Sequence, residues 1–126
     1  ACLVGSEMCI RDSAAAAREW MQRRTSAVIA HNDLMAMGFM IAVKSVGIEV
    51  PRDVSVVGTD NIFMSALFTP ALTTVTTSRN TQGKLAFNQL LEQLRHQHRD
   101  TGHLTTSIAM KLVERDSTAQ VPSLHR

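Results

Sequence analysis

The segment Glu49–Ile62, which reads EVPRDVSVVGTDNI, decides the fold class of this chain. It begins as a turn, continues as a short valine-rich run and ends in a polar cluster at Thr59–Asn61. The valines show little alternation with polar residues, which is typical of a parallel strand covered on both faces. Open α/β sheets bind small molecules just beyond the carboxyl ends of their strands, and Asp60 occupies that position.

A second segment has the same layout. The apolar run Ala27–Ala30 is followed at once by the polar residues His31–Asp33 and then by a helical pattern over Leu34–Val46. Gly47 suits the end of that helix, because glycine readily adopts the left-handed backbone found there. A strand, a helix and a strand at this spacing predict a βαβ unit with a right-handed crossover. The two polar clusters are then expected at the same edge of the sheet.

Each polar cluster has two interpretations. Asn32 or Asp33 can cap the helix by accepting a hydrogen bond from its first turn, and Thr59–Asn61 can stabilise a local turn. Alternatively, both clusters bind a ligand. A carboxylate such as that of Asp60 accepts hydrogen bonds from adjacent hydroxyls, and an Asn amide both donates and accepts. This chemistry suits a sugar or a nucleoside better than a phosphate.

The composition and the residue spacing argue against several other classes of protein. The chain has 126 residues, of which 44% are hydrophobic and 4% aromatic, and a net charge of +2, which is too small to indicate a nucleic-acid surface. It contains no apolar run of about 18 residues, so no membrane span is expected. The spacing of His96, His98 and His103 favours a solvated helix end over a metal site. No catalytic constellation stands out, so we expect no enzyme, no metal and no cofactor.

The rest of the chain is expected to add five elements. They are the end of a helix at Ala14–Arg24, a helical turn near Ile62–Phe68, an extended segment at Leu72–Thr77, a helix near 82–96 that buries Leu85, Leu90, Leu91 and Leu94, and a strand at 104–113. The helix after Asn32 is rich in methionine and apolar on more than one face. It is either a core helix alone or a helix that also packs on a second subunit.

Four segments together resemble one family. They are Asn32–Gly38 (NDLMAMG), Val50–Ile62 (VPRDVSVVGTDNI), Phe68–Val75 (FTPALTTV) and Leu112–Thr118 (LVERDST). Their order and spacing over residues 14–119 resemble the effector-binding domain of LacI/GalR-type transcriptional regulators. The resemblance implies an α/β fold, a fragment of the type I periplasmic-binding-protein fold, with a parallel sheet and helices on both faces.

The same resemblance implies how the chain is organised. Residues 14–72 would belong to the C-terminal subdomain of the effector-binding domain. Residues 73–119 would cross to a mostly missing N-terminal subdomain, contribute a helix and a strand, and return, and residues 120–126 would form a tail. DNA would be bound only through a helix-turn-helix that this sequence does not contain.

The resemblance also implies site residues. Asn32 and Asp60 would bind effector hydroxyls, His31 would line the cleft, and Met37 and Phe68 would contact the second subunit of a homodimer. The family often has an aromatic residue before the Asp that corresponds to Asp60, whereas this chain has Thr59. This difference leaves the identity of the effector open. The implied function is a cytoplasmic regulator that senses a sugar, a similar polyol or a nucleoside-like effector. The alternative is a periplasmic sugar-binding protein, and the upstream sequence would decide between the two.

The N-terminal segment carries a different resemblance. Residues 7–13, which read EMCIRDS, resemble the translation of the mosaic-end adapter used in transposon-based sequencing libraries. We therefore expect residues 1–13 to be non-native, although a native tail is the alternative. Cys2 and Cys9 both fall in this segment, so they support no disulfide or metal site.

Overall fold

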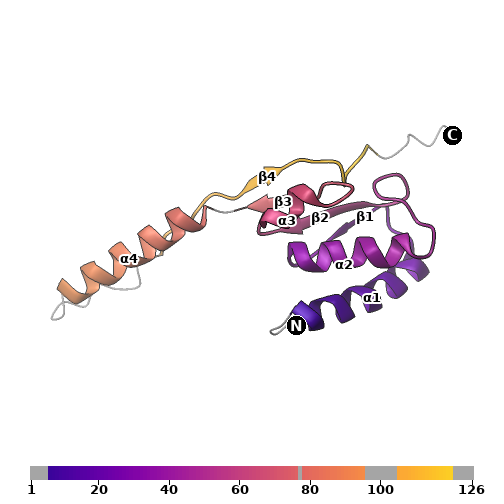
Figure 1. The fold of residues 1–126 in the computed structure, drawn as a ribbon. Helices are drawn as coiled ribbons and strands as arrows, with labels where there is room; N and C mark the ends of the chain where they lie inside the picture. The colour runs from indigo at the N-terminus through magenta and orange to yellow at the C-terminus, as the bar shows by residue number, and fades with distance from the viewer. Residues whose placement is uncertain (1–5, 77, 96–104, 121–126) are drawn as a thin grey trace. The chain divides into compact units, whose positions relative to one another are not determined.

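A computed structural model describes residues 6–76, 78–95 and 105–120. Its elements, shown in Figure 1, are α1 (Ser6–Arg23), β1 (Ala27–Ile29), α2 (Asp33–Lys44), β2 (Ser55–Thr59), α3 (Phe63–Leu67), β3 (Thr73–Thr76), α4 (Arg79–Arg95) and β4 (Lys111–Val113). The predicted α/β class is confirmed. Within the described ranges, every helix is too short or too polar to cross a bilayer.

The chain divides into two compact units. The first comprises Ala1–Thr76 with Leu112–Arg126, and the second is Thr77–Lys111. The assignment of these parts to the two subdomains of a binding-protein fold stays a prediction.

The sheet has the strand order β1-β2-β3-β4. β1 and β2 are parallel, with Val28 opposite Val56, and β2 and β3 are parallel, with Gly58 opposite Thr74. The predicted strand–helix–strand unit is therefore confirmed as β1, α2 and β2. Parallel pairing places the carboxyl ends of β1, β2 and β3 at one edge of the sheet.

Both ends of α2 follow from local sequence. Asn32 is the N-cap, with an extended backbone (φ −147°, ψ 170°), and its Oδ1 accepts a hydrogen bond of 2.8 Å from the Met35 amide. This bond satisfies one of the amides that a first helical turn leaves unpaired. At the other end, Gly47 adopts a φ of +80°, and the chain leaves the helix. The predicted cap and stop are thus both confirmed.

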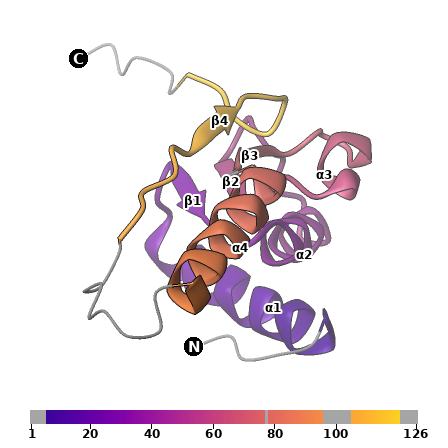
Figure 2. The same cartoon turned by 90° about the vertical axis from the view of Figure 1, so that its left-hand side faces the viewer.

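The core of the first unit lies between the sheet, α2 and α1. Figure 1 shows α2 beneath the sheet and α1 packed against α2, and Figure 2 shows the same order of layers from the side. The Trp20 ring of α1 meets Phe39 of α2 edge to face, with centroids 5.9 Å apart, and its indole N–H donates to the Thr25 carbonyl at 3.0 Å. A buried indole thus keeps a polar partner while its ring fills the core. The buried apolar residues are Ala17, Trp20, Ala36, Met37, Phe39, Met40, Val43, Ile48, Val54, Val56 and Leu72.

One serine attaches the C-terminal segment to this unit. The Ser117 hydroxyl is buried, donates to the Val56 carbonyl at 2.6 Å and accepts from the Thr73 amide at 2.8 Å. The Val56 amide in turn donates to the Ser117 carbonyl at 2.8 Å. The described segment after β4 is therefore fixed at Ser117 against the beginnings of β2 and β3.

Two predictions about the second unit are wrong. α4 begins at Arg79, where the Ser78 hydroxyl accepts from the Thr81 amide at 3.2 Å, but α4 buries none of its side chains. Leu90 and Leu94 are each 53% exposed, contrary to the expected buried face. The described residues of the chain supply no surface that covers this stripe.

The last strand is also shorter than predicted. Only Lys111–Val113 is a strand, whereas residues 105–110 have no regular structure and residue 104 lies outside the described ranges. An extended segment becomes a strand only where a neighbour completes its hydrogen bonds, and among the described residues β4 finds that neighbour in β3. The alternation of Ile108, Met110 and Leu112 predicted one apolar face, but Met110 is 57% exposed and Leu112 is 62% exposed.

The helix α1 extends through the adapter-like residues. It begins at Ser6, and the buried hydroxyl of Ser13 donates to the Met35 carbonyl of α2 at 3.1 Å. The non-native origin of residues 1–13 stays a prediction.

Close packing of β2 against α2 makes Gly58 sensitive to substitution. A Cβ at Gly58 would lie 2.2 Å from Asp33 Oδ1 and 2.9 Å from Leu72 Cδ2, so both groups would have to move. We expect Gly58→Ala to lower the free energy of unfolding by about 1–3 kcal/mol, the usual effect of overpacking a core. Urea unfolding followed by circular dichroism measures this change.

Gly83→Ala is the matched control. A Cβ at Gly83 of α4 meets nothing within 4 Å, and alanine favours a helix over glycine by about 0.5–1 kcal/mol. This variant should unfold no more easily than the parent chain. Equal unfolding midpoints for Gly58→Ala and the parent would contradict the packing described above.

Candidate functional site

Two polar segments meet at the carboxyl edge of the sheet. The Ala30 amide donates to the Val57 carbonyl at 2.8 Å, and the Thr59 hydroxyl reaches the Ala30 carbonyl at 3.4 Å. These bonds place His31–Asp33, after β1, beside the residues that follow β2. The expectation that both clusters share one edge is confirmed.

Asp33 has a structural role at this edge. Its side chain is fully buried and its carboxylate accepts hydrogen bonds from the Ile62 amide at 2.9 Å and from the hydroxyls of Ser65 and Thr74 at 2.5 Å each. A buried carboxylate is tolerated only when its oxygens are satisfied in this way. Asp33 therefore joins the start of α2 to α3 and β3, and it does not face a ligand.

The three residues predicted to bind effector lie around Asp33. His31 is exposed and Asn32 is half-buried, with its Oδ1 bonded to the first turn of α2. Asp60 is exposed at the end of β2. Their positions at one edge are as expected, whereas their binding roles stay predictions.

The backbone at Asp60 and Asn61 is unusual. Asp60 has a φ of 110° and Asn61 a φ of 51°, in the left-handed region that L-residues seldom adopt. Such conformations persist only when surrounding contacts hold them, and they are frequent at functional sites. The strained pair lies where an open α/β sheet binds its ligands, which makes Asp60 the strongest candidate in the described chain.

Sequence reasoning missed one partner of this loop. The Arg115 guanidinium donates from Nη2 to Asn61 Oδ1 and from Nη1 to the Leu72 carbonyl, each at 2.6 Å. Arg115 falls inside the LVERDST segment that carried the family resemblance. Its partners lie 54 and 43 residues away in the sequence, so no local pattern could indicate them.

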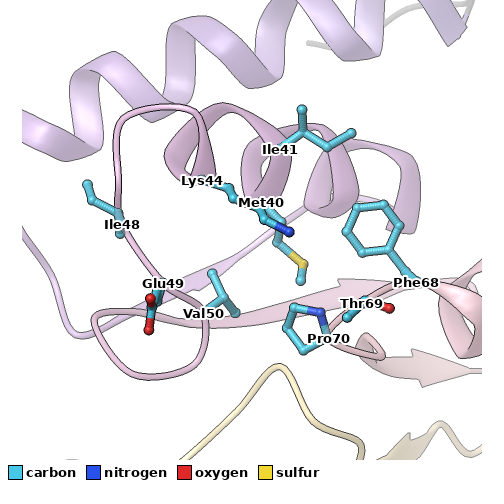
Figure 3. A pocket seen from close by; sticks show the side chains of 9 residues that line it. All are labelled: Met40, Ile41, Lys44, Ile48, Glu49, Val50, Phe68, Thr69 and Pro70. Carbon is cyan, nitrogen blue, oxygen red and sulfur yellow. The ribbon is translucent and has the colours of Figure 1, made fainter.

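A cavity of about 520 Å³ lies elsewhere in the first unit, as Figure 3 shows. Its lining is mostly apolar and consists of Met40, Ile41, Lys44, Ile48, Glu49, Val50, Phe68, Thr69 and Pro70. None of the three predicted effector-binding residues belongs to it. Its wall offers few hydrogen-bonding groups to a ligand rich in hydroxyls, so it matches the predicted effector chemistry less well than the strand edge does.

The residues predicted to contact a second subunit differ in exposure. Met37 is 6% exposed and belongs to the core, so it presents little surface, whereas Phe68 is half-buried and lines the cavity. Other apolar side chains of α2 and α3 are far more exposed. They are Leu34, Ile41, Phe63, Met64 and Leu67, which we call the α2–α3 surface.

A metal site finds no support in the described residues. Across those ranges, no group of three His, Cys, Asp or Glu residues is arranged to hold an ion. His96, His98 and His103 lie outside the described residues.

Comparison with known proteins matches residues 5–118 to a family described as a periplasmic binding protein-like domain. The HTH-type transcriptional repressor PurR of Edwardsiella ictaluri (strain 93-146) is 40% identical over 101 residues, which are 80% of this chain and 29% of that protein. This chain therefore spans less than a third of that relative.

Solved structures of transcription regulators also resemble the chain. A LacI-type transcription regulator from Bifidobacterium animalis subsp. lactis DSM 10140 is 33% identical, with a TM-score of 0.76 over 94% of this chain and 41% of that one. A LacI family transcriptional regulator from Arthrobacter sp. FB24, in complex with lactose, is 31% identical, with a TM-score of 0.70 over 90% and 42%. The resemblance to the effector-binding domain of LacI/GalR-type regulators is confirmed.

The role of Asp33 can be tested by Asp33→Asn. Ile62 and Ser65 donate to one carboxylate oxygen and Thr74 donates to the other, whereas an amide has a single acceptor oxygen. At least one donor therefore loses its acceptor, and the remaining hydrogen bonds lose the negative charge that strengthens them. We expect the free energy of unfolding to fall by about 1–3 kcal/mol, measured by urea denaturation.

The matched control is Glu19→Gln. Glu19 pairs with Arg23 at 3.2 Å on the surface of α1, where its side chain is 64% exposed. Exposed pairs of this kind contribute about 0.3–0.5 kcal/mol, so the control should change little. If Asp33→Asn and Glu19→Gln lower the free energy of unfolding equally, the Asp33 carboxylate does not stabilise the contacts between α2, α3 and β3.

Proposed function

Because the chain belongs to the periplasmic binding protein-like domain family, we propose that it is the effector-sensing part of a bacterial LacI-type transcriptional regulator. The named relatives are transcription regulators, which favours this role over a periplasmic sugar-binding protein. The complete protein would act in the cytoplasm and bind DNA through a helix-turn-helix. The role is one of sensing and requires no catalysis.

The observation that carries the proposal is the exposed Asp60 on a left-handed backbone at the carboxyl end of β2. Its carboxylate can accept hydrogen bonds from two neighbouring hydroxyls, and His31 and Asn32 lie at the same edge. This combination suits a sugar, a small polyol or the ribose of a nucleoside. Lactose in the Arthrobacter relative supports a carbohydrate as the first class to test.

The proposed mechanism is a shift between two conformations of the complete effector-binding domain. Two stretches of chain connect the described units, one after β3 and one within β4. An effector that binds one arrangement of the two subdomains more tightly favours that arrangement, and the DNA-binding region responds. The response is limited to the difference between the two binding free energies.

We also propose that the complete protein is a homodimer that uses the α2–α3 surface. Ile41 is 59% exposed, Phe63 is 80% exposed and Leu67 is 62% exposed, an unusual concentration of apolar side chains on two short helices. Phe68 and Ile41 of this surface line the same cavity. Met37 contributes mainly to the core beneath it.

The effector site is tested by Asp60→Ala and Asn32→Ala in a full-length version of the protein. For Asp60→Ala, loss of a charged hydrogen bond to the ligand should weaken binding by at least about tenfold, and by more than about a hundredfold if two bonds are lost. For Asn32→Ala, loss of a neutral hydrogen bond should weaken binding by about two- to tenfold. Calorimetry with ribose and lactose as probes measures affinity, and a reporter gene measures the response. Glu19→Ala, on the surface of α1, is the control for a lost carboxylate.

Both variants are expected to lose the effector response, whereas Glu19→Ala keeps it. Because Asn32 also caps α2, its variant is compared with the parent by thermal unfolding before binding is interpreted. Unchanged affinity and induction in both site variants would sink the assignment.

The dimer surface is tested by Ile41→Asp in the same full-length protein. A charge buried at the centre of an apolar interface should weaken dimerisation by about 2 kcal/mol or more, roughly thirtyfold, in sedimentation equilibrium. Val46→Asp places the same charge on another exposed apolar residue, just beyond α2, and should leave the dimer intact. Equal dissociation constants for the two variants would argue against the α2–α3 surface.

A further inference from the structure

The loop that carries Asp60 is held through its backbone. Three successive amides each have a partner, and each partner belongs to a different residue. The Asp60 amide donates to the Val75 carbonyl at 2.8 Å, the Asn61 amide to the Thr74 hydroxyl at 3.3 Å, and the Ile62 amide to the Asp33 carboxylate at 2.9 Å. The loop is thus fixed to β3 and to the start of α2.

These bonds hold a backbone that is intrinsically unfavourable. Left-handed backbone is tolerable for Asn61 but strained for most residues, and Asp60 with a φ of 110° lies beyond the usual left-handed minimum. The Asn61 amide bond to Thr74 is long at 3.3 Å and is the weakest of the three. A further contact at Asn61 therefore helps to hold the loop in this conformation.

Arg115 supplies that contact, and its own backbone and guanidinium are held by other hydrogen bonds. Its Nη2 donates to Asn61 Oδ1 at 2.6 Å, while its Nη1 donates to the Leu72 carbonyl at 2.6 Å. Its own amide donates to the Thr73 hydroxyl at 2.9 Å, and the side chain is half-buried. The guanidinium is planar, so one donor bound to Leu72 fixes the direction in which the other can bind Asn61.

We propose that Arg115 is a positioning residue that locks Asn61 in its left-handed conformation and thereby fixes the backbone of Asp60 at the sheet edge. The proposal deepens the proposed function and rests on it, since Asp60 is the effector-binding residue there. Arg115 acts through Asn61 and does not itself contact the effector. Its guanidinium binds two neutral oxygens, the Leu72 carbonyl oxygen and Asn61 Oδ1.

A purely structural role for Arg115 predicts something different. In that case removal of the guanidinium would loosen the whole first unit, because Leu72 and Thr73 belong to its core and central sheet. The positioning role predicts a local change confined to the Asp60–Ile62 amides. Hydrogen exchange resolves the two, because local opening and global unfolding are read at different amides.

The experiment is amide hydrogen exchange by NMR on the full 126-residue chain, with no ligand. Arg115→Met should accelerate exchange at Asp60, Asn61 and Ile62 by at least about tenfold, while amides in the middle of α2 change less than about threefold. Arg115→Lys, a point charge without the planar fork, should fall between the parent and Arg115→Met. Arg18→Met, an exposed residue of α1, is the control and should change neither set.

A second variant tests whether Arg115 acts through Asn61. Asn61→Gly adopts positive φ without strain but cannot bind the guanidinium, so adding Arg115→Met to it should accelerate exchange at Asp60 no further. Equal acceleration at all amides, no acceleration, or unprotected loop amides in the parent chain would each overturn the proposal. Failure of the proposed function is distinct: Asp60→Ala would then retain sugar affinity, whatever the exchange rates.

Discussion

The rest of the first unit depends on the buried carboxylate of Asp33. It accepts hydrogen bonds from the Ile62 amide and from the hydroxyls of Ser65 and Thr74, so one side chain joins α2, the loop after β2, α3 and β3. A carboxylate without water is stable only while all these donors are present. The same carboxylate also restricts position 58 to glycine, since any side chain there would collide with it.

This arrangement separates two acidic residues that look alike in the sequence. Asp33 is fully buried and its oxygens are used within the fold, whereas Asp60 is exposed on strained backbone at the same edge. Asn32 combines a structural role with a position at the candidate site, because its Oδ1 caps α2 and the residue lies at the same sheet edge. A buried residue that orders the edge and an exposed residue that faces outward are what a preorganised binding site requires.

Sequence reasoning succeeded where the pattern is local. The hydrophobic periodicity predicts the strand–helix–strand unit. The backbone preferences of single residues predict the helix cap at Asn32 and the helix end at Gly47. It failed for the leucine stripe of α4 and for the strand predicted at 104–113, because burial and pairing depend on neighbours that a periodic pattern does not specify.

The candidate site divides in the same way. The family resemblance and the strand-end position indicated Asp60, and the shared edge followed from parallel pairing. The triple acceptor role of Asp33 and the bond from Arg115 to Asn61 could not be predicted, because their partners lie 29 to 54 residues away. Which donors converge on a buried oxygen is a property of the folded chain.

The central claim is that an effector binds at the strand edge marked by Asp60 and not in the apolar cavity beside Phe68. The most direct measurement is an NMR titration of a full-length version of the protein with ribose and with lactose, in which amide shifts are followed at both places. The largest shifts are predicted at His31, Asn32 and Asp60. Largest shifts at Ile41 and Phe68, with the strand edge unchanged, would contradict the claim.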